Sequence, residues 1–372
     1  MVLRKWESMS SPIFIITLKF LFQGFFLPFT FRFIITFAPA MQKILIIQTA
    51  SLGDVILATA LAASIKIRYP DAVLTMLVKK PYNAILSENE VVDYVWFWDK
   101  SSKKYRNLLA LRREIKKQQF DFVINLHRFA SSGFLTAFSG AKFKAGFKSN
   151  PFSLFFNAKA IHTLNGVHEI ERNLTLGKLC FPDIERANPQ ITPVEPEGYQ
   201  KYFENNQKVV CLFPGSLWKT KMLPVEQWMK VAVSLPDDFI LLLMGSLEDT
   251  TLSEKILQIR PKNTYNICGC LSVNESSWIM KKAVMNYCND SAPTHLASAV
   301  NAPVTTVFCS TVPDFGFTPL SDISFIVEYA EKLACRPCGI HGHRACPEKH
   351  FHCGTKIETK QLLEGIKDYV GL

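Results

Sequence analysis

The sequence predicts an α/β protein built from two doubly wound parallel sheets in tandem. Apolar, strand-like runs alternate with helical patterns, a proline-rich segment interrupts this alternation, and the alternation then restarts. Strands that are apolar throughout and separated by helices are typical of a parallel sheet covered on both faces. With 372 residues the chain also exceeds what one core usually supports, so we expect two domains.

The composition indicates a folded protein with a basic surface. Apolar residues make up 48% of the chain and charged residues 20%, which excludes a disordered protein. An excess of 42 Lys and Arg over 32 Asp and Glu leaves a net charge of +10. Such a field suits phosphates, nucleic acid or an anionic membrane surface, and it does not choose among them.

Residues 1–40 differ from the rest of the chain. Ile13–Phe37 is rich in Phe, but Lys19 and Arg32 interrupt it, so it falls short of the roughly 18 apolar residues of a spanning helix. No A-x-A-like cleavage site follows it. Two interpretations remain, a peripheral membrane segment or a leader upstream of the fold. We favour the leader, because an α/β domain would naturally begin at Met41.

The first domain is expected to span residues 41–190. Its strands are expected at Lys43–Gln48, Ala72–Val78, Tyr94–Trp98 and Phe120–Leu126, and its helices at Asp54–Arg68 and Leu108–Gln118. The segment Pro182–Gln200 contains four prolines and few apolar residues. It indicates an irregular connection, and we place the linker at residues 191–205.

The second domain is expected to span residues 206–355, with a C-terminal helix at 356–372. Its strands are expected at Lys208–Ser216, Phe239–Ser246, Thr264–Gly269, Ala283–Ser291 and Pro303–Ser310, and its helices at Val225–Ser234, Thr251–Arg260 and Pro293–Val300. Open parallel sheets bind ligands at the carboxyl ends of their strands. The chemistry should therefore come from loops that follow strands.

The first such loop is TASLGDVI, in which the chain turns through Gly53 and a helix starts at Asp54. Small residues here would let the helix N-terminus face an anionic ligand. Asp54 is either a charge favoured by the helix dipole or a catalytic base. The loop contains neither G-x-G-x-x-G nor G-K-[ST], which argues against a dinucleotide site and against a P-loop.

The second loop is FPGSLWKTKMLPVEQW, at the first turn of the second domain. Gly215 and Ser216 follow the strand, and Lys219 and Lys221 precede a helix that starts after Pro224. A hydroxyl and an ammonium group at this place could clamp a diphosphate.

The third loop is CNDSAPTHLASAV, which places Asp290 and Ser291 at the end of a strand and His295 in the helix that follows. It is either a capped helix with His295 packed inside the fold, or another oxyanion-binding helix terminus with Ser291 and backbone donors on a phosphate.

The C-terminal part carries a dense cysteine and histidine segment, CRPCGIHGHRACPEKHFHC. Its four cysteines are Cys335, Cys338, Cys346 and Cys353. The C-x-x-C at its start predicts a structural zinc site, although the later cysteines do not form a second C-x-x-C. Disulfides in an oxidising compartment and reduced, unligated thiols are the alternatives.

The three loops and the cysteine segment together resemble glycosyltransferase family 9, the lipopolysaccharide core heptosyltransferases. SGAKFKAGF at 139–147 and VHEIERNL at 167–174 are also similar to that family, and the order of the motifs agrees from Met41 to the C-terminus. The resemblance implies a GT-B fold, in which two Rossmann-like domains face a central cleft. It also implies inverting, metal-independent transfer from a nucleotide-diphosphate sugar, typically ADP-heptose, to a lipid-linked saccharide.

The resemblance assigns roles to individual residues of this sequence. The family's catalytic aspartate falls on Asp54, its phosphate-binding hydroxyl and lysine on Ser216 and Lys221, and its ribose-binding acid on Glu248. The D-[TS]-G-x-x-H turn falls on Asp290, Ser291 and His295. The sequence departs from the family at Ala292, where glycine is usual, and at Gln48, where a basic residue is common.

The resemblance further implies a cytoplasmic protein, peripheral on the inner face of the inner membrane, that needs no cofactor for catalysis. The zinc predicted from the cysteine segment would be structural only. The protein's partners would be the sugar donor, the saccharide acceptor and the membrane surface, and not nucleic acid. Two alternatives stay open: a GT-B enzyme with a different nucleotide-sugar donor, and a basic Cys/His-rich protein that binds nucleic acid.

Overall fold

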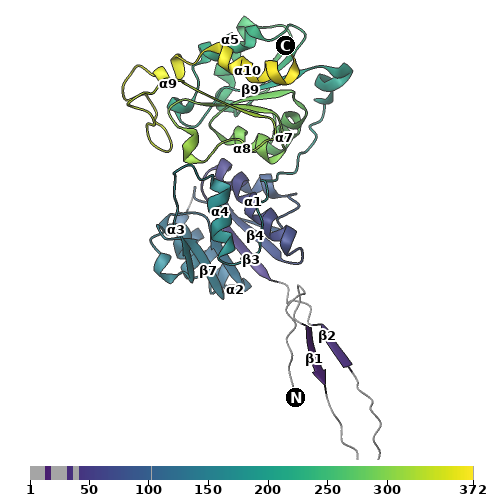
Figure 1. The fold of residues 1–372 in the computed structure, drawn as a ribbon, viewed down its shortest axis with the longest axis vertical. Helices are drawn as coiled ribbons and strands as arrows, with labels where there is room; N and C mark the ends of the chain where they lie inside the picture. The colour runs from purple at the N-terminus through teal and green to yellow at the C-terminus, as the bar shows by residue number, and fades with distance from the viewer. Residues whose placement is uncertain (1–12, 18–31, 37–41, 102, 372) are drawn as a thin grey trace, which may run out of the picture. The chain divides into compact units, whose positions relative to one another are not determined.

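The computed structural model describes residues 13–17, 32–36, 42–101 and 103–371 (Figure 1). The chain divides into residues 1–42 and a compact unit of residues 43–372. In the first part, β1 (Ile13–Thr17) pairs antiparallel with β2 (Arg32–Thr36). The expectation of a leader or membrane segment at residues 1–40 rests mostly on residues outside the described ranges. Within those ranges, no helix has the length and apolar character needed to cross a membrane.

The compact unit begins with a six-stranded parallel sheet, which we call the N-terminal half. The strands lie in the order β5-β4-β3-β6-β7-β8. They are β3 (Lys43–Gln48), β4 (Val73–Lys79), β5 (Tyr94–Trp98), β6 (Phe122–Asn125), β7 (Phe143–Phe147) and β8 (Ala158–Ala160). Every residue of β3 except Lys43 is buried, as expected for a central strand with helices on both faces.

The C-terminal half repeats the same topology. Its parallel sheet has the order β11-β10-β9-β12-β13-β14. The strands are β9 (Val209–Phe213), β10 (Ile240–Leu243), β11 (Thr264–Asn266), β12 (Met285–Asn289), β13 (Val304–Phe308) and β14 (Ser324–Glu328). In both halves the first strand lies in the middle and the strand order reverses beside it, between β3 and β6 and between β9 and β12. Ligands bind open α/β sheets at such switch points.

Helices cover the faces of both sheets (Figure 1). Those of the N-terminal half are α1 (Leu52–Arg68), α2 (Lys104–Gln118), α3 (Ala130–Ala137) and α4 (Glu169–Lys178). Those of the C-terminal half are α5 (Val225–Ser234), α6 (Thr250–Ile259), α7 (Val273–Lys282), α8 (Ala292–Ala299), α9 (His352–Thr355) and α10 (Thr359–Val370). The predicted strand at Tyr94–Trp98 and helix at Val225–Ser234 are confirmed to the residue.

One apolar cluster runs through both halves. It contains Ile46 and Val55 from β3 and α1, together with Leu296 and Ala297 from α8. The buried faces of α1 and α8 are therefore parts of one core, and the two halves pack against each other through these helices. This packing brings the loop after β3 towards the loop after β12.

The connection between the halves is irregular, as its prolines predict, but it is bonded to its surroundings along its length. The backbone N–H groups of Ala187 and Gln190 donate to the hydroxyls of Ser64 and Thr59 on α1. Further on, Asn274 Nδ2 of α7 donates to the carbonyl of Thr192 at 2.9 Å. These bonds fasten the connection to both halves.

Several helices start earlier than the sequence predicts. α2 begins at Lys104 and not at Leu108, and α1 begins at Leu52 and not at Asp54, because Ser51 is its N-cap. The sequence analysis also left α3, β7, β8, α4, α7 and β14 unassigned. These elements are short or amphipathic with weak apolar contrast, and packing on the sheets decides their structure.

Candidate active site

Asp54 lies in the first turn of α1 and is tied to the cap of that helix. Ser51 Oγ donates to Asp54 Oδ2 at 2.5 Å, and the Ser51 backbone N–H donates to the same oxygen at 3.0 Å. Both bonds go to Oδ2, and within the described residues Oδ1 accepts none. Asp54 therefore stabilises the N-terminus of α1, as the helix-dipole interpretation expects. This role uses only one of its two carboxylate oxygens.

A buried hydrogen-bonded pair, Thr49 and His127, lies at the switch point of the N-terminal half. Thr49 Oγ1, in the loop after β3, lies 2.9 Å from Nδ1 of His127, which follows β6. Burial, aided by the charges of Lys100 and Arg128, lowers the pKa of His127 to about 4. The ring is therefore neutral at physiological pH. It joins the Asp54 loop to the loop that leads into α3.

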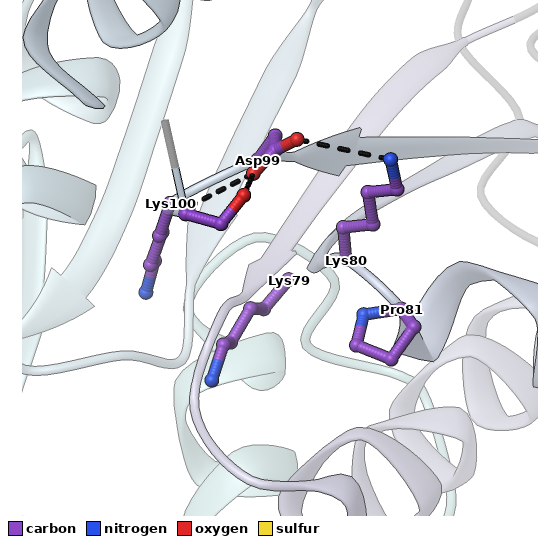
Figure 2. Close-up of a pocket in the computed structure, with 6 residues that line it drawn as sticks. Lys79, Lys80, Pro81, Asp99 and Lys100 are labelled. Atoms are coloured by element: carbon purple, nitrogen blue, oxygen red, sulfur yellow. Dashed lines mark hydrogen bonds and ion pairs between the residues drawn. The ribbon is translucent and has the colours of Figure 1, made fainter. Parts of the chain in front are cut away.

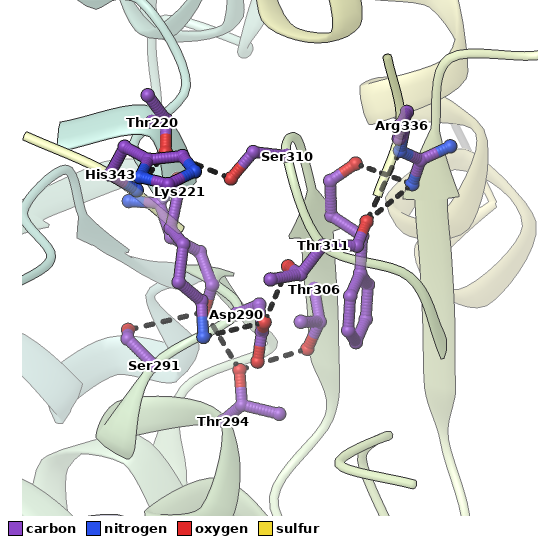
Figure 3. A network of polar contacts seen from close by, with 12 residues as sticks. Thr220, Lys221, Asp290, Ser291, Thr294, Thr306, Ser310, Thr311, Arg336 and His343 are labelled. Carbon is purple, nitrogen blue, oxygen red and sulfur yellow. Dashed lines mark hydrogen bonds and ion pairs between the residues drawn. The ribbon is translucent and has the colours of Figure 1, made fainter. Parts of the chain in front are cut away.

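The second predicted loop forms a network with the third (Figure 3). Lys221 Nζ lies 2.6 Å from Asp290 Oδ2, and Thr311 Oγ1 donates to the same oxygen at 2.6 Å. Asp290 is only 5% exposed, and the Lys221 side chain 15%. The structure thus brings the predicted phosphate-binding lysine and the predicted turn aspartate together as an ion pair.

Asn289, the last residue of β12, holds these two loops in place. Its Nδ2 donates to the carbonyls of Pro214 and Gly215 at 3.0 and 3.1 Å, and its Oδ1 accepts from the Leu223 N–H at 2.8 Å. Asn289 is fully buried. Its side chain spans the switch point of the C-terminal half and sets the path of the loop that carries Ser216 and Lys221.

The two halves meet at Gly53 and His295. A Cβ on Gly53 would lie 2.7 Å from His295 Cδ2, so only glycine permits this close approach. His295 is 5% exposed, and its Nδ1 has no hydrogen-bond partner among the described residues. Burial, with the charges of His168 and Lys221, lowers the pKa of His295 to about 3. His295 therefore packs as a neutral ring between the halves, as the first α8 interpretation expects, and Ser291 is the N-cap residue of α8, while oxyanion binding at this helix terminus stays a prediction.

A buried group of charged side chains, formed by Glu169, Arg172 and His162, affects the pKa of Asp54 through Glu169. Glu169, at the start of α4, accepts from Arg172 Nε at 2.7 Å, and His162 Nε2 lies 3.5 Å from the same oxygen. Burial first, and then the negative charge of Glu169, raises the pKa of Asp54 above its ordinary value, although the Ser51 bonds and His341 act in the opposite direction. The environment thus makes Asp54 a stronger base than a solvated aspartate.

Arg172 also links the halves. Its guanidinium donates to the carbonyl of Phe315, a residue of the C-terminal half, at 3.0 Å. Nearby, the Glu169 N–H donates to the carbonyl of Gly316 at 2.8 Å, and His168 Nε2 contacts the carbonyl of Thr318 at 3.0 Å. The start of α4 is therefore fastened to the loop that follows β13.

The remaining predicted donor residues lie around the end of β9 and β10. A Cβ on Gly215 would lie 1.9 Å from Asp249 Oδ1, so this glycine is required by close packing. Asp249 Oδ2 accepts from the N–H and hydroxyl of Ser246 at 2.9 Å and closes a capping box. Glu248 beside it is exposed, as is appropriate for a ligand-binding carboxylate, and Ser216 is partly exposed.

The cysteine-rich segment folds back onto the second loop. Thr220 Oγ1 accepts from the His343 N–H at 2.7 Å and from Ser310 Oγ at 3.0 Å (Figure 3). The ring of His341 stacks on Trp218, with 6.3 Å between ring centroids and 17° between planes. His341 also opposes the rise in the pKa of Asp54, so the segment lies within electrostatic reach of the Asp54 loop.

The four cysteines do not form a metal-ligand set in this arrangement. Cys353 is 3% exposed and packs in the apolar core of the C-terminal half, and Cys338 Sγ donates to the carbonyl of Cys335. Across the described residues, no three His, Cys, Asp or Glu side chains are grouped so that they could hold a metal ion. The structural zinc therefore stays a prediction.

The structure adds residues that the sequence analysis did not select. Asn289, Thr220, Thr311 and the Glu169–Arg172 pair all act on predicted site residues, Thr220 and Asn289 from within the second and third loops and the others from outside the three loops. Asn289 directly precedes Asp290, so its place at a strand end was a usable signal. Glu169 and Arg172 lie in the segment VHEIERNL, but no spacing rule indicates that they approach Asp54.

Comparisons with known proteins agree with this arrangement. The chain is 21% identical over 341 residues to the lipopolysaccharide core heptosyltransferase OpsX of Haemophilus influenzae, covering 89% of this chain and 95% of the relative. It is 23% identical over 353 residues to the lipopolysaccharide heptosyltransferase 1 of Campylobacter coli, covering 89% and 99%.

Among solved structures, the E. coli ADP-heptose lps heptosyltransferase II matches with a TM-score of 0.70 and 18% identity, over 88% of this chain and 98% of that one. This likeness and the two repeated sheets establish the GT-B fold. Residues 108–351 match the profile of glycosyltransferase family 9 (heptosyltransferase), which is more than half of the chain. The protein therefore belongs to glycosyltransferase family 9, the heptosyltransferase family, and is a glycosyltransferase.

Proposed function

We propose that this protein transfers a heptose from ADP-heptose to a lipopolysaccharide core saccharide, with inversion at the anomeric carbon and without a catalytic metal. The proposal rests on one observation: the loops at the switch points of the two sheets lie next to each other. Asp54 stands after β3, and Lys221, Asp290 and Ser291 stand after β9 and β12, with Gly53 in contact with His295 between them. A base and a cationic clamp thus come from different halves.

In the proposed step, the acceptor hydroxyl attacks the anomeric carbon of the donor. Its proton passes to Asp54, the new glycosidic C–O bond forms, and the bond from the anomeric carbon to the diphosphate oxygen breaks with its electron pair on that oxygen. A raised pKa suits this role, since a carboxylate that is poorly solvated gains more by accepting a proton. The free Oδ1 is the oxygen that we assign to the proton.

The leaving diphosphate gains negative charge during the step. Fixed donors that face the place where charge develops stabilise a transition state more than mobile ones. Lys221 is held by Asp290, and the N-terminus of α8 begins at Ser291 beside it. We assign these groups to the diphosphate, and Glu248, which is exposed at the end of β10, to the ribose of the nucleoside.

A basic pocket on the N-terminal half suits an anionic acceptor (Figure 2). It has a volume of about 460 Å³ and lies after β4 and β5, lined by Lys79, Lys80, Pro81, Asp99, Lys100 and Ser101. Lys100 Nζ donates to the carbonyl of Thr49 at 2.9 Å, so the pocket adjoins the loop that carries Asp54. We assign it to carboxylate or phosphate groups of the saccharide, in a reaction at the inner face of the inner membrane.

The donor is tested by thermal unfolding with ADP-, UDP- and GDP-sugars at equal concentrations. A ligand that binds only the folded state stabilises it by mass action, by about 2.7 kcal/mol at one hundred times its dissociation constant. We expect ADP-heptose to raise the melting temperature most. A larger shift with a UDP- or GDP-sugar would favour the GT-B enzyme with a different donor.

Transfer is then followed directly by mass spectrometry with ADP-heptose and a saccharide acceptor that lacks the heptose. The proposal predicts an acceptor product heavier by one heptose, with ADP released in equal amount. Anomeric configuration by NMR separates inversion from retention. Turnover that survives exhaustive chelation is expected for metal-independent transfer, and a loss of turnover that added metal restores would contradict it.

A further inference from the structure

A group of four Phe rings and one Leu covers part of the N-terminal half. We call it the aromatic patch. Its exposed members are Phe138, Leu154 and Phe155, and its partly exposed members are Phe134 and Phe152. The four rings contact one another with centroid separations from 5.1 to 6.3 Å. Leu154 is 85% exposed and Phe155 54%. Single exposed apolar residues are ordinary, but contiguous ones mark an interaction surface.

The backbone beneath the patch is held firmly. Asn150 is 2% exposed, its Nδ2 donates to the carbonyls of His127 and Phe129 at 3.1 Å, and its Oδ1 accepts from the Phe152 N–H at 2.9 Å. Gly133 of α3 allows close packing here, because a Cβ would lie 1.9 Å from Asn150 Oδ1. The fold thus presents Leu154 and Phe155 on an ordered loop next to α3.

The segment that carries the patch is basic throughout. No Asp or Glu occurs between Asp121 and Glu169. The same stretch contains Arg128, Lys142, Lys144, Lys148 and Lys159. Lys148 is exposed and lies at the base of the patch, because its carbonyl accepts from Ser153 Oγ at 3.0 Å. A partner that binds this surface should therefore have an apolar interior and an anionic outer layer.

The patch is continuous with the candidate active site. Phe129 is 68% exposed and precedes α3, and its ring lies edge-on to His127 with 4.8 Å between centroids. His127 in turn contacts Thr49, in the loop that leads to Asp54. A short run of adjacent residues thus joins the catalytic turn to the exposed rings (α3 is labelled in Figure 1).

We propose that the aromatic patch docks this enzyme on an anionic lipid bilayer, with Leu154 and Phe155 entering the headgroup region and the neighbouring lysines facing lipid phosphates. The inference rests on the proposed function, since a lipid-linked acceptor has to be reached at a membrane surface. A second copy of the chain fits the patch poorly, because two such basic segments would repel each other. Docking through this face places the lipid end of the acceptor at the patch and its saccharide at the Asp54 loop.

The test uses the full chain and vesicles of phosphatidylcholine with and without phosphatidylglycerol. Leu154→Glu with Phe155→Glu should reduce binding to the anionic vesicles by about tenfold or more, since each change replaces a buried apolar contact with a charge repelled by the lipid. Val233→Glu is the matched control, because Val233 is 58% exposed on α5 of the C-terminal half. Lys148→Glu should weaken binding to anionic vesicles only.

An assay of transfer to a soluble acceptor distinguishes a failure of this inference from a failure of the proposed function. The Leu154 and Phe155 variant should keep its rate on a soluble acceptor and lose rate on acceptor embedded in vesicles. Vesicle binding equal to that of the Val233 control would overturn the inference, as would a change in oligomeric state measured by light scattering with vesicle binding intact. Absence of heptose transfer by the unmodified chain would instead refute the proposed function.

Discussion

In the proposed mechanism, the Asp54 carboxylate both caps α1 and acts as the base. Its Oδ2 closes the capping box of α1 with Ser51, and this fixes the side-chain orientation. The desolvated setting beside Glu169 raises its pKa, so the carboxylate form is stable only above a pH higher than for a solvated aspartate. A base of this kind works while it is deprotonated, and activity should fall as pH drops through that pKa.

The effect of Glu169 on the pKa of Asp54 can be tested by measuring how kcat/KM depends on pH. Glu169→Gln removes a negative charge near Asp54, so the pKa of Asp54 should fall and the acid limb of kcat/KM should move to lower pH. Glu171→Gln is the matched control on the same helix, since Glu171 pairs at the surface with Arg186. An acid limb that does not move, or moves equally in the control, would contradict the assignment of Asp54 as the titrating base.

Lys221 and Lys219 offer a second comparison at this scale. Lys221→Ala should raise the dissociation constant of ADP by roughly tenfold, because it removes a cation aimed at the diphosphate. It should also cost about 1 to 3 kcal/mol of stability, because the buried carboxylate of Asp290 loses its partner. Lys219→Ala, at an exposed neighbour, should change neither quantity appreciably.

A double variant separates the two effects of Lys221. Lys221→Ala with Asp290→Asn removes both charges, so stability should recover while ADP affinity, measured by calorimetry, stays low. If affinity recovers together with stability, Lys221 acts only as a structural partner of Asp290 and the clamp assignment is wrong.

At the scale of elements, the sequence predicts the central strands and the turns that follow them. β3 and β9 are buried apolar runs, and each is followed by a glycine that permits close packing, Gly53 in the first turn of α1 and Gly215 in the loop after β9. The sequence analysis did not assign α4 and β7, which are short elements of ten and five residues. It also cannot indicate that Asn289 joins two loops 66 to 76 residues apart, since that contact exists only after the sheet has formed.

Asn289 provides the test at this scale. Asn289→Ala leaves the Leu223 N–H and two buried carbonyls without their partner, which should lower the free energy of unfolding by about 2 to 3 kcal/mol. Asn266→Ala loses weaker bonds of 3.2 and 3.4 Å and serves as the control. Denaturant unfolding curves measure both. Equal losses in the two variants would remove the special role of Asn289.

The cysteine-rich segment marks a limit of sequence patterns. The four cysteines are close in sequence, yet Cys353 contributes to the apolar core and the backbone of His343 bonds to Thr220. Structural zinc stays a prediction, and elemental analysis of protein purified without added metal tests it. One equivalent of zinc per chain would support it, and a small fraction of an equivalent would reject it.

At the scale of the whole molecule, the chain divides into residues 1–42 and a compact unit of residues 43–372. We expect a chain that begins at Met41 to fold and to keep its transfer rate on a soluble acceptor, because β3, the first strand of the large sheet, starts at Lys43. Melting temperature and turnover relative to the full chain measure this. An insoluble product, with the full chain well behaved, would show that the preceding segment is required for folding.

In the proposed reaction, each half of the molecule supplies different groups. Asp54 and the basic pocket belong to the N-terminal half, and Lys221, Asp290 and Ser291 to the C-terminal half. The contact between Gly53 and His295 and the bonds from α4 to Gly316 hold these groups in register. A change to the base should therefore affect the chemical step without affecting donor binding.

The measurement that tests this division most directly is donor affinity and single-turnover transfer in the same Asp54→Asn protein. The account predicts a fall in the transfer rate of about a thousandfold, within the usual range for loss of a general base, and a calorimetric donor affinity within about twofold of the unmodified chain. Near-normal transfer by Asp54→Asn, or a loss of donor affinity as large as the loss of rate, would contradict it.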